Sequence, residues 1–136
     1  MNKLMETNMY NISETLIIIG SCLESMQPES LSKLKKISNN ILTLCLEETH
    51  INMAITKISA MLSTNKVKNI IFASVDKSPH CVQLHYIGHE LKRIMDLKDI
   101  DIKNYVVVDN ELIEISPKTI SLSKNLSKLE SLNKEP

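Results

Sequence analysis

A buried strand followed at once by a helix is the pattern that most restricts how this chain folds. Residues 70–75 are apolar on both faces, which favours a β-strand covered by helices on two sides. Ser78 and Pro79 then fit the N-cap and the first position of a helix that we expect to end near Met95. Strand, loop and helix in this order indicate an α/β fold.

A hairpin and a last helix are predicted after this unit. Residues 105–108 form a second β-favouring run, residues 109–110 (Asp-Asn) fit a two-residue turn, and residues 111–115 provide the partner strand. The Ser116-Pro117 pair repeats the cap-and-proline start. The apolar residues that follow it predict a final amphipathic helix.

The first part of the chain is expected to be helical. Asn11 and Glu14 have the spacing of a capping box, in which the Asn side chain accepts a backbone hydrogen bond and the Glu reaches back. A helix is therefore predicted from this point to about Met26.

A second helical stretch is predicted from Pro28. Apolar residues keep a helical period from there through Ser63. This span is either one long helix of the kind that pairs with a second copy, or two helices separated near residues 48–50. In the second case Thr49 would cap the third helix of the chain.

Together these elements predict a single α/β domain over residues 1–136. An N-terminal layer contains three helices, or two helices of which one is long. It packs on a small three-stranded mixed sheet that contains a βαβ unit and the hairpin, and a C-terminal helix follows. A chain of this length buries roughly two thirds of its unfolded surface, so it needs neither disulfides nor a metal ion to fold. Residues 1–10 and 133–136 are expected to fray.

Charge and cysteine content limit the expected partners. Sixteen basic and sixteen acidic residues give a formal net charge of zero, which disfavours a role in binding nucleic acid. The three cysteines are an odd number and lie far apart, which indicates free thiols in a reducing compartment, and we expect a cytoplasmic protein. No apolar run approaches the roughly 20 residues of a membrane span, so no membrane partner is expected.

The helix start at residue 78 is the candidate site. Residues 78–89 contain three of the four histidines and one of the three cysteines. His80 and Cys81 fall at the second and third helical positions, where the helix dipole and a neighbouring imidazolium favour a thiolate. Cys81 is therefore the candidate nucleophile or soft ligand, with His80 as its catalytic partner. The alternative is that Cys81 is a small buried hydrophobe, as most free cysteines are.

The same junction offers a site for a small anionic ligand. A helix that begins after the carboxyl end of a parallel strand faces the usual ligand crevice of an open α/β sheet. The backbone of residues 78–81, the Ser78 hydroxyl and Lys77 would hold a phosphate or carboxylate. Asp76 would orient the His80 imidazole or oppose the anion. The chain has two glycines in all, so a glycine-rich phosphate loop is excluded.

A metal site is the third expectation. Cys81, His85 and His89 recur every four residues and share a helix face, but the first and last lie about 12 Å apart along the axis, too far for one ion. His85 with one neighbour would need further ligands from Glu48 and His50, a set that suits zinc or iron. The alternative is that both histidines are partly solvated on the helix surface and that the carboxylates are solvated too.

No catalytic signature is complete, so neither a substrate nor a reaction is predicted. Cys22 and Cys45 lie within apolar runs and are interpreted as core residues. The first hypothesis is a ligand or metal site at residues 76–85, used for binding, thiol redox chemistry or a small transfer reaction. The alternative is an interaction subunit without a cofactor, whose helical layer forms a homodimer or binds a partner.

Two segments carry a resemblance to known proteins. Residues 46–54 (Leu-Glu-Glu-Thr-His-Ile-Asn-Met-Ala) and 75–86 (Val-Asp-Lys-Ser-Pro-His-Cys-Val-Gln-Leu-His-Tyr) resemble a family of small uncharacterised proteins from anaerobic bacteria and archaea. The resemblance covers about half of the chain. It implies a cytosolic protein of an anaerobe, and because it implies no activity, no site residue is carried over from it.

Overall fold

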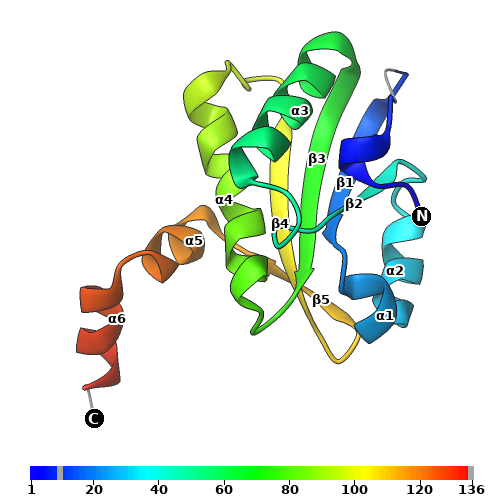
Figure 1. The fold of residues 1–136 in the computed structure, drawn as a ribbon. Helices are drawn as coiled ribbons and strands as arrows, with labels where there is room; N and C mark the ends of the chain where they lie inside the picture. Colours follow the sequence, from blue (N-terminus) through cyan, green and yellow to red (C-terminus); the bar gives the residue numbers. More distant parts are fainter. Residues whose placement is uncertain (9–10, 135–136) are drawn as a thin grey trace.

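The centre of the protein is a five-stranded sheet (Figure 1), seen in a computed structural model that describes residues 1–8 and 11–134. The strands are β1 (Ser13–Gly20), β2 (Ile41–Leu44), β3 (Lys66–Val75), β4 (Asp101–Val108) and β5 (Glu111–Ile115). They lie side by side in the order β2-β1-β3-β4-β5. The first four are parallel, and β5 pairs with β4 in the antiparallel direction.

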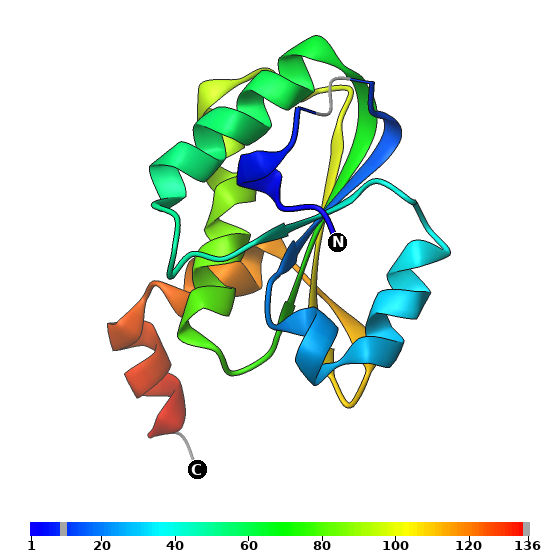
Figure 2. The ribbon, with the colours of Figure 1, turned by 45° about the vertical axis from the view of Figure 1, so that its right-hand side comes forward.

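Helices cover both faces of the sheet (Figures 1 and 2). They are α1 (Leu23–Met26), α2 (Pro28–Lys35), α3 (Ile51–Thr64), α4 (Pro79–Ile94), α5 (Pro117–Ser123) and α6 (Leu126–Asn133). Helices α3 and α4 pack on one face, and α1 and α2 pack on the other. Helix α5 lies against α4, and α6 extends away from the body of the protein (Figure 1).

Two apolar layers, one on each face of the sheet, explain why β1 is apolar along its length. Leu16 and Ile18 belong to the layer under α3 and α4, whereas Ile17 and Ile19 belong to the layer under α1 and α2. All four side chains are fully buried. A parallel strand with helices on both faces requires such a continuous apolar run.

The predicted helix over residues 11–26 is wrong, because β1 occupies half of this segment and only α1, at its end, is helical. Asn11 and Glu14 have capping-box spacing, but the backbone at Glu14 has a φ of 65° and lies at a register shift where β1 pairs with β3. An apolar run that is buried on two faces has no period that separates a strand from a buried helix. The isoleucine-rich composition of this run suits the strand.

The predicted helical stretch over residues 28–63 is interrupted by a strand. Helix α2 is short, β2 follows it, and α3 begins after the expected break near residues 48–50. His50 rather than Thr49 caps α3, since its Nδ1 accepts the Asn52 N–H at 3.2 Å. The three-stranded sheet under an N-terminal helical layer is therefore wrong, and the long helix considered for dimerisation does not form.

The strand, loop and helix around residue 78 confirm the prediction. β3 ends at Val75, Ser78 is the N-cap of α4, and Pro79 is its first residue. The helix ends at Ile94, next to the predicted Met95. Together with β4, these elements form the expected parallel βαβ unit.

The hairpin is also confirmed, whereas the last helix differs. Asp109 and Asn110 have φ values of 50° and 62° in the turn between β4 and β5, as a type I′ turn requires. The Ser116 Oγ accepts the Thr119 N–H at the start of α5. The final helix is two helices, because Asn125 caps α6 separately.

The first residues are joined to the body of the protein. Leu4, in the 3-10 helix η1 (Leu4–Glu6), is fully buried in the layer under α3 and α4. Residues 9, 10, 135 and 136, which belong to the segments expected to fray, lie outside the described residues. Within the described ranges, no helix combines the length and apolar character needed to cross a membrane. That residues 1–136 form one domain stays a prediction.

Candidate functional site

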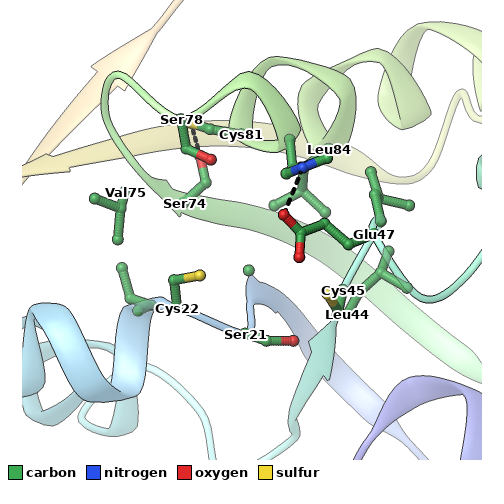
Figure 3. A pocket seen from close by; sticks show the side chains of 14 residues that line it. Ser21, Cys22, Leu44, Cys45, Glu47, Ser74, Val75, Ser78, Cys81 and Leu84 are labelled. Carbon is green, nitrogen blue, oxygen red and sulfur yellow. Dashed lines mark hydrogen bonds and ion pairs between the residues drawn. The ribbon is translucent and has the colours of Figure 1, made fainter.

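The candidate site lies where the strand order reverses. From β1 the chain crosses to β2 on one side and then to β3 on the other, so the loops after β1 and β3 diverge at the carboxyl ends of the strands. A hollow of about 110 Å³ lies at this point (Figure 3). We call it the switch-point hollow; it is lined by residues 20–23, 44–47, 74, 75, 78, 80, 81 and 84.

All three cysteines of the chain line the switch-point hollow. Cys22 follows β1, Cys45 follows β2 and Cys81 lies in the first turn of α4, just after β3. The first is exposed, the second half-buried and the third buried, and all three are free thiols. Figure 3 shows the sulfur of Cys22 pointing into the space between the starts of α1 and α4. Because the carboxyl ends of parallel strands share one sheet edge, the fold gathers thiols that are far apart in sequence.

A chain of buried hydrogen bonds leads from Cys81 into the protein. The Cys81 Sγ contacts the Ser74 Oγ, and the same oxygen lies 2.7 Å from the His85 Nε2. The His85 Nδ1 lies 2.9 Å from the Asn104 Oδ1. Ser74, His85 and Asn104 are each at most 4% exposed. We call these four side chains the buried polar chain; it joins β3, α4 and β4.

The hydrogen bonds of the buried polar chain assign its protons. Because the Asn104 Oδ1 can only accept, the His85 Nδ1 carries a proton and donates it. The His85 Nε2 then accepts from the Ser74 hydroxyl, which in turn accepts from the Cys81 thiol. All four groups are neutral in this arrangement, and the Cys81 S–H, Ser74 O–H and His85 Nδ1–H protons each have an acceptor.

Burial keeps both titratable members of the chain neutral. Burial lowers the pKa of His85, whereas the hydrogen bond that its Nδ1–H donates to the Asn104 Oδ1 raises it. Burial also raises the pKa of the Cys81 thiol; the Ser74 hydrogen bond opposes this rise, and the charge of Asp76 adds to it. The resting state is therefore a thiol beside a neutral imidazole, which opposes the expectation of a resting thiolate at Cys81.

His80, the expected catalytic partner of Cys81, pairs with Glu47, and its role beside Cys81 stays a prediction. Its Nε2 lies 2.9 Å from the Glu47 Oε1; the His80 side chain is half-buried and the Glu47 side chain is largely exposed. In Figure 3 the Glu47 side chain reaches from the β2–α3 loop across one side of the switch-point hollow to meet the start of α4. The pair therefore forms part of the rim of the hollow.

The three residues expected to hold an anion face two different spaces. Ser78 lines the switch-point hollow, and its side chain makes no capping hydrogen bond to α4. Asp76 and Lys77 instead line a second hollow of about 180 Å³ between α4, β4 and α5, which Cys81 and His85 also line. The Lys77 backbone has a φ of 73°, a left-handed conformation that turns the chain between β3 and α4. The expected anion site over these three residues therefore stays a prediction.

The residues expected to bind a metal are dispersed. His85 is only 2% exposed and belongs to the buried polar chain, so the expectation that it is partly solvated is wrong. His50 caps α3, and Glu48 lines a separate hollow beside η1. Burial and the charges of Lys124, Lys92 and Arg93 lower the pKa of His89, against Glu90. The described residues contain no group of three or more His, Cys, Asp or Glu side chains that could hold a metal ion.

Sequence reasoning missed Ser74 and Asn104, and it placed Cys22 and Cys45 in the core. The first two carried a weak signal, since each is a polar residue inside a strand that is otherwise largely apolar. Cys22 and Cys45 lie just after the ends of β1 and β2. Because these segments were interpreted as helices, the position of the two cysteines did not indicate a site. Their roles depended on identifying β1 and β2 correctly.

A mostly parallel sheet with helices on both faces and a hollow at the reversal of strand order defines a doubly wound α/β domain. The chain belongs to the Rossmann-like domain family, whose model matches residues 11–135. This match supports the resemblance to a family of uncharacterised proteins, here of archaeal type. It does not show that the protein comes from an anaerobe. The search of curated proteins and the search of solved structures gave no match.

The site lacks the usual features for binding a dinucleotide. The junction of β1 and α1 reads Gly20-Ser21-Cys22-Leu23, with one glycine where the dinucleotide fingerprint has three. The hollow is also smaller than the roughly 300–1,000 Å³ of typical sites for larger ligands. The geometry therefore favours a smaller ligand.

Proposed function

We propose that this protein binds a small thiol-reactive organic molecule in the switch-point hollow, and that Cys81 is the thiol that engages it. The observation that carries the proposal is the presence of all three thiols, at the carboxyl ends of three adjacent strands, in one hollow at the reversal of strand order. Ligands of open α/β sheets bind at this position. A free thiol in such a hollow is positioned to attack an electrophilic carbon of the ligand.

The surroundings of Cys81 support an organic ligand over a metal ion. The hollow is lined mainly by apolar surface, which suits an apolar body of a few heavy atoms. Cys81 lies in the first turn of α4, where the positive end of the helix dipole favours negative charge that develops during attack. A metal would need several ligands at about 2 Å, and the described side chains do not form such a group.

Site-resolved alkylation tests this proposal. The folded, untagged chain is treated with iodoacetamide, and the modification of each cysteine is followed by peptide mass spectrometry. We expect Cys81 to be modified in the folded protein. Its modification should then slow the labelling of Cys22 and Cys45, because the added group occupies their shared hollow. In urea the three cysteines should react independently, which provides the control.

Two results would contradict the proposal. The first is a Cys81 that reacts no faster than the protein unfolds, which would mean that the hollow does not admit a small molecule. The second is a metal ion that copurifies at about one per chain in native mass spectrometry and protects all three thiols. That result would replace the organic ligand with a metal.

A second candidate function is that of an interaction subunit, and the geometry of α6 favours it. No residue of α6 is buried, and Leu126 is 75% exposed on a helix that extends away from the body (Figure 1). Leu126, Leu129 and Leu132 recur every three residues and lie near one another on the helix surface. The mass of the protein in solution tests this candidate, since Leu126→Glu should shift an oligomer to the monomer.

A further inference from the structure

The buried polar chain has the geometry of a proton relay. We infer that His85 accepts the proton of Cys81 through the Ser74 hydroxyl, with Asn104 holding the imidazole in position, so that a buried neutral thiol becomes a nucleophile only as it reacts. This inference rests on the proposed function, because it explains how Cys81 would attack a ligand in the switch-point hollow.

The placement of the chain supports a relay. Ser74 follows Ile70 and Phe72 on the face of β3 that packs against α4. Cys81 and His85 lie four residues apart, on one side of α4, and both are buried against this face. A series of buried polar groups within an apolar layer is costly unless each is hydrogen-bonded. Here the bonds run without a gap from the hollow to β4.

The proposed step conserves atoms and charge. The Cys81 S–H proton moves to the Ser74 oxygen while the Ser74 O–H proton moves to the His85 Nε2, so the hydroxyl is restored. The products are a thiolate and an imidazolium, whose Nδ1–H bond to the Asn104 Oδ1 becomes a charge-assisted one. The thiolate sulfur then forms a bond to an electrophilic carbon, and the leaving group departs with its electron pair. The proton on His85 returns to solvent or to the leaving group.

Other charged and titratable groups surround the relay from several elements. Asp76 disfavours the thiolate, and its exposed position weakens this effect. Asp76 and Lys77 face His85 and Cys81 across the second hollow. The remaining groups face Cys81 from the rim and walls of the switch-point hollow: Glu47, His80, Cys22 and Cys45. The Ser74 hydroxyl is the group that contacts both Cys81 and His85.

The pH dependence of Cys81 alkylation by iodoacetamide tests the relay. In this reaction the sulfur bonds to the carbon of the reagent and iodide leaves. Rates at Cys81 are measured from pH 5 to 10 in the full chain by peptide mass spectrometry. The variants are His85→Gln and Asn104→Asp, and the matched control is His89→Gln, one turn further along α4.

The relay predicts that the two variants change the alkylation rate of Cys81 in opposite directions. His85→Gln removes the proton acceptor and should lower the rate at pH 7 by about tenfold or more, which corresponds to a rise of one unit in the apparent pKa. Asn104→Asp places a carboxylate beside the imidazolium and should raise the rate by a similar factor. His89→Gln should leave the profile unchanged within about twofold.

Each other outcome overturns the relay or the proposed function separately. If Cys81 reacts in the folded wild type and its pH profile is the same in all three variants, the thiol ionises without His85 and the relay is wrong, while the proposed function stands. If Cys81 reacts only on unfolding, the proposed function fails as well. If His85→Gln does not fold, the alkylation rate of Cys81 in Asn104→Asp decides. An unchanged or lower rate would mean that the bond between Asn104 and His85 is only structural, and the relay would be wrong.

Discussion

Ser74 occupies a position in β3 where the neighbouring residues of the same face are apolar. It contacts both Cys81 and His85, so one hydroxyl satisfies two buried polar groups. Losing a partner of a buried polar group costs about 1–3 kcal/mol, because the group cannot regain its bonds to water. The stability of α4 on the sheet therefore depends on this serine as well as on apolar contacts.

Ser74→Ala should destabilise the protein by about 1–3 kcal/mol, because the His85 Nε2 loses its donor. Urea unfolding measures the change. The exposed Ser32 in α2 provides the control, and Ser32→Ala should change stability by less than about 0.5 kcal/mol. Equal effects of the two substitutions would mean that the buried polar chain contributes nothing to stability.

The two titratable members of the chain should also set the pH range of maximal stability. Burial lowers the pKa of His85 from 6.5 in the folded state, so the unfolded chain binds a proton more readily as the pH falls below 6.5, and stability should decrease there. Burial raises the pKa of Cys81 from 9.0, so the unfolded thiol loses its proton first above that pH, and stability should decrease again. Stability should therefore be highest between these two values.

Urea unfolding from pH 5 to 10 measures this dependence. His85→Gln should flatten the acid limb and Cys81→Ser the alkaline limb. His89→Gln is the comparison, because the lowered pKa of His89 contributes to the acid limb independently. An acid limb that is as steep in His85→Gln as in the wild type would contradict the assignment.

At the scale of elements, Gly88 sets how closely α4 approaches the sheet. A Cβ at this position would lie 3.2 Å from the Ile102 Cγ2 of β4 and 3.7 Å from the Phe72 Cε2 of β3. The absence of a side chain therefore lets the helix lie close enough for His85 to reach Asn104 on β4. This packing places the buried polar chain at its observed distances.

Gly88→Val should destabilise the protein by about 1–3 kcal/mol, because its branched side chain overpacks the contact with Ile102. Gly88→Ala should cost much less, since the gain in helix propensity of about 1 kcal/mol offsets the tight contact. Adding Ile102→Val to Gly88→Val should recover part of the loss in thermal unfolding. No recovery would mean that another contact sets the helix position.

At the scale of the whole molecule, α5 and α6 differ in how they are attached. The end of α5 is held on α4, where the Lys124 ammonium lies 4.8 Å from the centre of the Tyr86 ring. Helix α6 contributes no buried residue. The fold should therefore not depend on α6, which leaves this helix available to a partner.

A chain that ends after Lys124 should unfold within about 2 °C of the full chain, because little apolar area is lost. Thermal unfolding measured by circular dichroism tests this expectation. The comparison is a chain that ends before Pro117, which also loses the buried Ile120 and should unfold at a clearly lower temperature. A large loss on removing α6 alone would mean that α6 is covered in solution, as in an oligomer.

Local chemistry made part of this protein predictable from its sequence. Ser78 and Pro79 identify a helix start, and Asp109 and Asn110 identify a turn, because each acts through its own backbone geometry or that of its neighbours. These signals do not depend on what packs nearby. The location of the candidate site beside Cys81 followed from them.

The tertiary structure alone decided the identity of β1 and β2 and the surroundings of the candidate site. An apolar run such as residues 16–19 suits a buried helix and a buried strand equally, and pairing with β3 settles the choice. The fold brings Cys22 and Cys45 into the switch-point hollow with Cys81, and it buries His85 between Ser74 and Asn104. Such contacts join residues far apart in the chain, so they follow from the order of the strands rather than from any local pattern.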